Sequence, residues 1–160
     1  MINIKNRLIA YFSWSGSTEA IAEMTQEITG ADIFHIETVK PYPKGYLRTV
    51  RIAKKELKNN ERPKLTSKVS DMDSYDVMYL GFPSWWGTIP MAVCSFLESY
   101  DFSGKTIIPF CSHGGGGIGR SVDTIKKICP KTKVENAIAL YGGSVNASKQ
   151  EVKDWIKSCE

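Results

Sequence analysis

Residues 75–87 read YDVMYLGFPSWWG. From Tyr75 to Phe82 the run is almost continuously apolar, with Asp76 as its single charge. Such a run is typical of a β-strand that is covered on both faces. Two adjacent tryptophans follow directly at the carboxyl end of this strand. The stretch therefore predicts a strand at the centre of a sheet, with an aromatic loop at its end.

Outward from this strand, strand-like and helix-like segments alternate along the chain. The expected strands cover residues 7–12, 32–38, 75–82, 105–111 and 134–140, and the expected helices cover 17–28, about 46–58, 90–100, 119–128 and 148–158. Strict alternation of this kind predicts an α/β fold in which a parallel sheet has helices on both faces. No linker interrupts the pattern, so we expect residues 1–160 to form a single domain.

Composition excludes several classes of protein. With 160 residues, 42% of them apolar and 24% charged, the chain is neither disordered nor collagenous. Its four cysteines form no Cys-x-x-Cys pair and lie near no histidine cluster, so we expect buried thiols and no metal site. No apolar run is long enough for a signal sequence or a membrane span, which predicts a cytoplasmic protein without a membrane partner.

The positive charge belongs to one segment. Residues 40–68 hold ten basic and two acidic residues, a net charge of +8, whereas the rest of the chain sums to −4. At about 100° per residue, the expected second helix gathers Lys44, Arg48, Arg51, Lys55 and Lys58 on one face. This distribution argues against a nucleic-acid partner. The face is either a solvated surface or a docking site for an acidic partner.

Three loops of unusual composition follow the ends of expected strands, and in an open parallel sheet these ends form the ligand site. The first loop consists of Ser13, Trp14, Ser15, Gly16, Ser17 and Thr18. Backbone N–H groups, hydroxyls and the dipole of the following helix make it suitable for a phosphate, held without any Lys or Arg. An ordinary serine-rich helix cap is the alternative.

The second loop runs from Pro83 to Thr88, and its candidate ligand-binding residues are Pro83, Ser84, Trp85, Trp86 and Gly87. Two neighbouring side chains of an extended segment point to opposite sides, so at least one tryptophan is expected to face a ligand. A flat aromatic ligand would stack there.

The third loop runs from Ser112 to Gly119, and its candidate ligand-binding residues are Ser112, His113, Gly114, Gly115, Gly116 and Gly117. Partial matches to the P-loop and dinucleotide patterns carry little weight this late in the chain. Consecutive glycines instead allow a flat ligand to approach backbone N–H donors, although a flexible turn is the alternative. His113 is either a donor at this rim or a solvated side chain.

Together the loops resemble those of a flavodoxin. The motif Ser13-x-Ser15-Gly16-x-Thr18 is followed by residues 81–87 (GFPSWWG) and 112–116 (SHGGG), and the resemblance extends from Arg7 to Trp155. It implies a three-layer sandwich of the short-chain type with five parallel strands in the order 2-1-3-4-5. It also implies noncovalent FMN. The first loop would hold the phosphate, the second would wrap the ring, and Ser112 with the glycines would donate to its pyrimidine edge.

The resemblance implies an electron-transfer protein that shuttles electrons between redox partner proteins. One alternative is an FMN-dependent NAD(P)H oxidoreductase of quinones or nitro compounds, and another is a phosphate- or nucleotide-binding module without redox function. No side chain is singled out as catalytic. In contrast to common flavodoxins, the third loop has no acid, Tyr or Trp between Ser112 and Arg120. Fewer negative charges beside reduced flavin predict a less negative second reduction potential.

Overall fold

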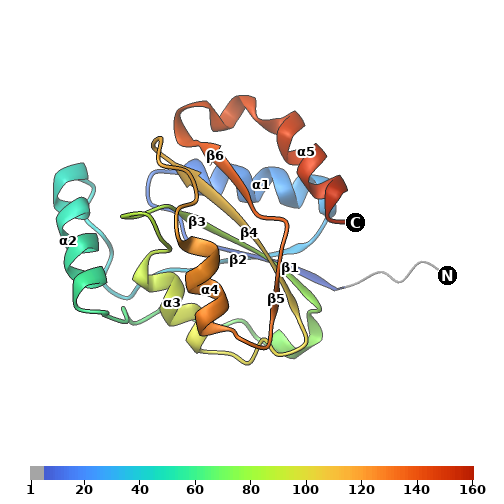
Figure 1. Ribbon diagram of the computed structural model, residues 1–160, viewed down its shortest axis with the longest axis horizontal. Helices are drawn as coiled ribbons and strands as arrows, with labels where there is room; N and C mark the ends of the chain where they lie inside the picture. Colours follow the sequence, from blue (N-terminus) through green and yellow to red (C-terminus); the bar gives the residue numbers. More distant parts are fainter. Residues whose placement is uncertain (1–5) are drawn as a thin grey trace.

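The computed structural model describes residues 6–160, which form a parallel sheet with helices on both faces (Figure 1). The strands are β1 (Arg7–Tyr11), β2 (Asp32–His35), β3 (Val77–Pro83), β4 (Thr106–His113), β5 (Lys133–Val134) and β6 (Ile138–Tyr141). Their order is β2-β1-β3-β4-β5, and β6 also pairs with β4. All these pairings are parallel. The predicted fold class and strand order are confirmed.

The fifth strand is the one departure in topology. The sequence predicts a single strand over 134–140, but β5 pairs with Thr106 and Ile107, and β6 pairs with the end of β4. Between them Asn136 has a φ of 54°, a left-handed conformation that does not fit an extended ladder. The carbonyl of Asn136 accepts a hydrogen bond from Trp155 Nε1 at 2.5 Å. This hydrogen bond joins the interrupted edge of the sheet to the terminal helix.

The helices form two layers around the sheet. On one face lie α1 (Ser17–Thr29) and α5 (Lys149–Ser158), and on the other lie α3 (Met91–Glu98) and α4 (Ser121–Ile128). Short 3₁₀ helices occur at η1 (Met72–Ser74) and η2 (Gly142–Ala147). None of the helices among residues 6–160 has the length and apolar character needed to cross a membrane.

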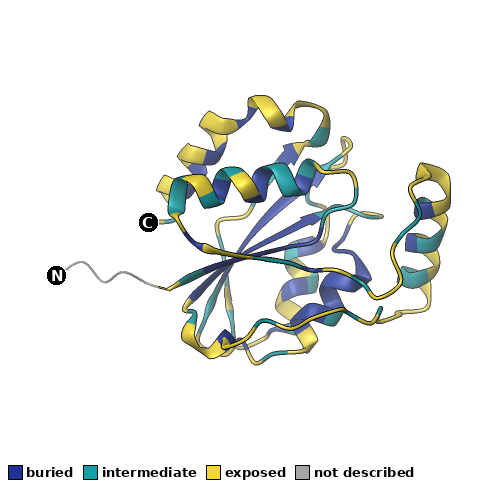
Figure 2. Cartoon of the chain, turned by 180° about the vertical axis from the view of Figure 1, so that it is seen from behind, coloured by how far each residue is buried: buried dark blue, intermediate teal, exposed yellow. Residues whose placement is uncertain are grey.

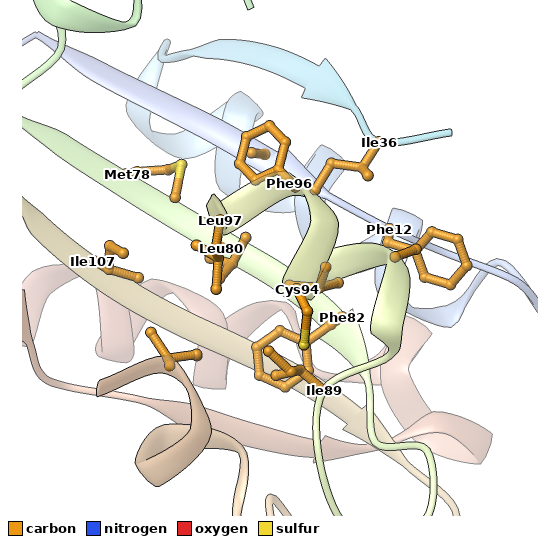
Figure 3. Close-up of a cluster of buried hydrophobic side chains, with 14 of the residues drawn as sticks. Phe12, Ile36, Met78, Leu80, Phe82, Ile89, Cys94, Phe96, Leu97 and Ile107 are labelled. Atoms are coloured by element: carbon orange, nitrogen blue, oxygen red, sulfur yellow. The ribbon is translucent and has the colours of Figure 1, made fainter. Parts of the chain in front are cut away.

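Two hydrophobic cores flank the sheet, because successive residues of each strand point to opposite faces. In β3, Met78, Leu80 and Phe82 pack toward α3 and α4, and Figure 3 shows them interleaved with helical side chains such as Phe96. Tyr79 packs on the opposite face, toward α1 and α5. This burial on both faces is what the apolar run at 75–82 predicts.

Helix α2 (Tyr46–Lys58) is placed differently from the other helices. Figure 1 shows it beyond the carboxyl ends of the strands, on the side of α3. Its outer face is exposed, whereas Thr49 and Ala53 are buried on the inner face (Figure 2). Thr49 Oγ1 donates to the Pro43 carbonyl at 2.7 Å, and Tyr42 donates to Glu56 at 2.6 Å. These bonds fix the helix to the segment that precedes it.

Candidate functional site

A cavity of about 580 Å³ opens at the carboxyl ends of β1, β3, β4 and β6. All three predicted loops contribute to it, in agreement with the rule that parallel strands place their ligand site at this edge. The residues around the cavity are Trp14, Ser15, Ser17, Tyr46, Thr49, Val50, Ala53, Pro83, Ser84, Trp85, Trp86, Ser112, His113, Gly114, Tyr141, Gly142 and Gly143.

The first loop leads into the amino end of α1. Gly16 adopts a φ of 97° there, which lets the chain turn sharply before the helix. Ser13 does not line the cavity, because its hydroxyl accepts hydrogen bonds from the N–H groups of Gly16 (3.3 Å) and Glu19 (3.2 Å). The hydroxyls of Ser15 and Ser17 do line it, and no bond within residues 6–160 uses the N–H of Ser17 or Thr18. The site thus combines free backbone donors with two hydroxyls.

Thr18 and Ser112, which the sequence assigns to opposite ends of the ligand, contact each other. Their hydroxyls are 2.8 Å apart, and both residues are buried. Thr18 does not line the cavity, because its hydroxyl faces Ser112 of β4. This bond joins the first loop to the third, and a direct role of Thr18 in phosphate binding stays a prediction.

The second loop is a tight turn rather than an extended segment. Trp85 and Thr88 exchange backbone hydrogen bonds, and Trp86 and Gly87 between them have φ values of 56° and 77°. Trp85 packs edge-on against Phe12 at a ring-centroid distance of 5.4 Å. Trp86 is 46% exposed. One tryptophan is therefore exposed, as predicted, but the reason is the turn and not the alternation of an extended chain.

Trp86 is held between the turn and α2. Its Nε1 donates to the Val50 carbonyl at 3.1 Å, and Lys54 Nζ lies 5.1 Å from the centroid of its ring. A left-handed φ is uncommon for a tryptophan, and such conformations cluster at ligand sites. The indole lines the cavity next to α2.

The third loop begins later than expected, because β4 continues through Ser112 and His113. His113 Nδ1 accepts the N–H of Gly115 at 3.0 Å, and its ring lies 6.3 Å from that of Tyr141. Of the four consecutive glycines only Gly114 lines the cavity, whereas Gly115, Gly116 and Gly117 lie outside it. Donation from those three to a ligand stays a prediction.

The end of the third loop contacts the second loop. Arg120 N–H donates to the Gly87 carbonyl at 2.7 Å. Gly119, with a φ of 58°, lies so close that a Cβ atom there would overlap the Gly87 carbonyl oxygen and approach the carbonyl carbon within 2.8 Å. Gly87 itself does not line the cavity.

Sequence reasoning missed two walls. The inner face of α2 contributes Tyr46, Thr49, Val50 and Ala53. The helical spacing of Tyr46, Val50 and Ala53 is visible in the sequence, but periodicity does not show what this face covers. The end of β6 and the turn after it contribute Tyr141, Gly142 and Gly143. The same strand-end rule that located the other loops would have pointed to this segment. The Gly142 carbonyl accepts a hydrogen bond from Ser17 Oγ at 3.4 Å.

The described side chains that line the cavity are almost all uncharged. Among the described residues that line it there is no carboxylate, lysine or arginine, and His113 is the only histidine. Behind the wall, burial raises the pKa of Cys111 to about 12, so this residue stays a neutral thiol. No group of three His, Cys, Asp or Glu side chains within residues 6–160 is arranged to hold a metal ion.

The flavodoxin family model matches residues 6–159. A candidate flavoprotein from Bacteroides uniformis is 32% identical, with a TM-score of 0.85 over 96% of this chain and 98% of that one. The flavoprotein from Lactobacillus acidophilus in complex with FMN is 22% identical, with a TM-score of 0.72 over 90% and 98% of the chains. The Fusobacterium nucleatum flavodoxin bound to flavin mononucleotide is 17% identical, with a TM-score of 0.60 over 98% and 97%. No curated protein matches at a significant level. Because the family model spans nearly all of the sequence and the folds agree, this chain belongs to the flavodoxin family.

Proposed function

We propose that the protein binds FMN noncovalently and transfers electrons between partner redox proteins. The observation that carries the proposal is the composition of the cavity, which combines aromatic walls with neutral hydrogen-bond donors at the amino end of α1. Solved relatives of the same fold from Lactobacillus acidophilus and Fusobacterium nucleatum contain FMN.

The residues around the cavity fit the chemistry of FMN. Ser15 and Ser17, together with the free N–H groups at the amino end of α1, would hold the phosphate. The aromatic side chains of Trp14, Trp86 and Tyr141 provide apolar area for the ring system. A volume of about 580 Å³ lies within the usual range for cofactor sites.

The polar edge of the ring would lie near Ser84, Ser112, His113 and Gly114, which supply hydroxyl, imidazole and backbone donors. His113 Nδ1 accepts a hydrogen bond, so the proton of the neutral imidazole resides on Nε2. His113 can therefore donate a hydrogen bond from Nε2. FMN supplies the redox chemistry when bound, and the chain supplies orientation and exclusion of water.

Reconstitution tests the proposal. The purified protein is stripped of flavin and titrated separately with FMN and with riboflavin, and binding is followed by quenching of flavin fluorescence. We expect FMN to bind more tightly than riboflavin, because only FMN presents a phosphate to the first loop. A protein that binds phosphate compounds but never FMN would instead be a phosphate- or nucleotide-binding module.

A second candidate function is an FMN-dependent NAD(P)H oxidoreductase of quinones or nitro compounds. The wall that α2 adds to the cavity favours it, because Val50 and Ala53 form an apolar surface where a small acceptor can lie. Anaerobic mixing of the FMN-loaded protein with NADPH separates the two functions. A carrier is not reduced until a reductase is added, whereas an oxidoreductase is reduced rapidly by NADPH alone.

A further inference from the structure

The outer face of α2 carries uncompensated positive charge. Six cations lie on the helix or just before it, and all of them are exposed: Lys44, Arg48, Arg51, Lys54, Lys55 and Lys58. No ion pair within residues 6–160 involves any of the six. The single acid of the helix, Glu56, is half-buried and bound to Tyr42. We refer to these six residues as the basic α2 face.

Large apolar side chains are exposed beside these cations. Leu47 and Tyr46 are each 69% exposed in the first turn of α2. Trp86 reaches the same helix through its bond to the Val50 carbonyl, with Lys54 against its ring. An apolar centre containing aromatic residues, surrounded by a charged rim, is the usual anatomy of a protein–protein interface.

This surface adjoins the cavity. Tyr46 and Trp86 belong to both, since each lines the cavity and is also exposed at the end of α2. A partner seated on the helix would therefore lie next to whatever the cavity holds.

We propose that the basic α2 face docks an acidic electron-transfer protein, with Leu47 and Trp86 as its apolar contacts. The proposal deepens the proposed function and rests on it. In each encounter one electron leaves the reduced partner and enters the bound flavin, so no further reactant is needed. The partner is recognised by aspartate and glutamate side chains around its own redox centre.

The charge distribution favours a protein over a nucleic acid or a second copy of the chain. Outside residues 40–68 the chain carries a net charge of −4, which repels a long polyphosphate and orients the molecule with α2 toward a compact acidic partner. A second copy would present its own basic α2 face, and its acidic charge is spread over several elements. Electrostatic steering of this kind raises association rates by about 10- to 1,000-fold.

Stopped-flow kinetics test the proposal with the FMN-loaded protein and a reduced, acidic [2Fe–2S] ferredoxin as the probe. The test variant is Arg48→Glu/Arg51→Glu/Lys55→Glu. Its control, Lys127→Glu/Lys153→Glu/Lys157→Glu, makes the same change of net charge on exposed positions of α4 and α5. We expect the second-order rate constant to fall at least tenfold in the test variant and less than threefold in the control.

Salt provides a second readout. The wild-type rate should fall as ionic strength rises from about 0.01 M to 0.15 M, because the Debye length shrinks from about 30 Å to 8 Å. A third variant, Leu47→Ala, should slow the reaction at high salt, where only the apolar contact remains. Basic cytochrome c, used as an acceptor from the reduced protein, should not be slowed by the charge reversal.

Three results would overturn the docking proposal while leaving FMN binding intact. The first is a second-order rate constant that does not change with ionic strength, and the second is an equal rate constant for the test and control variants. The third is a basic α2 face that binds duplex DNA at physiological salt but does not bind the ferredoxin. Salt-dependent dimerisation in analytical ultracentrifugation that disappears in the test variant would assign the face to a second copy and also overturn it. Failure to bind FMN at all would refute the proposed function instead, so the two failures are distinguishable.

Discussion

Gly119→Ala should destabilise the protein because the third loop and the second loop contact each other at this residue. Gly119 has a left-handed φ of 58°, and its missing side chain makes room for the Gly87 carbonyl. The neighbouring Arg120 N–H donates to that carbonyl at 2.7 Å. A methyl group at position 119 must push the two segments apart and lengthen this bond.

Three costs add up for this variant. The left-handed conformation costs an alanine about 1–2 kcal/mol. Relieving the overlap costs about 1–3 kcal/mol, as for other overpacked sites. The weakened hydrogen bond costs about 1 kcal/mol. We therefore expect Gly119→Ala to lower the free energy of unfolding by at least about 3 kcal/mol.

Two neighbouring glycines serve as matched controls. Gly117 also has a positive φ, 71°, but a Cβ there meets no atom within 4 Å, so Gly117→Ala measures the backbone cost alone, about 1–2 kcal/mol. Gly116 has neither constraint, and Gly116→Ala should change stability by less than about 0.5 kcal/mol.

Urea unfolding of the flavin-free protein, followed by far-ultraviolet circular dichroism, ranks the three variants. We expect the order Gly116→Ala, Gly117→Ala, Gly119→Ala, with the last clearly separated from the second. FMN affinity should fall only in Gly119→Ala, because only this change displaces the turn that holds Trp86. Equal stabilities for Gly117→Ala and Gly119→Ala would refute the role of the Gly87 contact.

Three further predictions concern the cavity and its wall. Ser15→Ala/Ser17→Ala should weaken FMN binding at least tenfold but leave riboflavin binding almost unchanged in fluorescence titrations, since each hydrogen bond to a charged group contributes about 1.5–3 kcal/mol. Spectroelectrochemical titration should give a second reduction potential less negative than that of a typical flavodoxin, because no carboxylate lines the cavity; a strongly negative couple would contradict this. Burial raises the pKa of Glu56, so the folded state binds its proton more tightly than the unfolded state, and this contribution to stability is lost as pH rises above the ordinary value of about 4.3. Glu56→Gln should remove that loss in urea unfolding between pH 4 and 7 while keeping the bond from Tyr42, and an unchanged pH profile would show that Glu56 is not its source.

The strand pattern could be predicted because it depends on burial alone. The run at 75–82 is apolar since β3 is covered on both faces, and each residue of such a strand must be compatible with one of the two cores. Where a single backbone angle interrupts a strand, the apolar pattern of the sequence does not show the break. Asn136 breaks the expected fifth strand through its own backbone angle, which no hydrophobic periodicity reveals.

Within the site, sequence reasoning located the loops but not their internal geometry. Ser13 and Thr18 belong to the predicted phosphate loop, yet the hydroxyl of Ser13 binds backbone N–H groups and that of Thr18 binds Ser112. Each hydroxyl has several partners within reach of the folded chain. Which of them it bonds depends on where α1 begins and how β4 ends, and both are set by packing.

By itself, the sequence determined the α/β class, the strand order expected from the family resemblance, and the three loops that meet at one edge of the sheet. Only the tertiary structure decided that α2 forms a wall of the cavity, that Trp86 bridges this wall to the turn, and that Tyr141 completes the site. The physical reason is that periodicity reports which face of an element is apolar but not what that face covers. The apolar stripe of α2 faces the cavity, and the basic α2 face lies next to this stripe. This placement of the helix comes from contacts between residues far apart in the sequence.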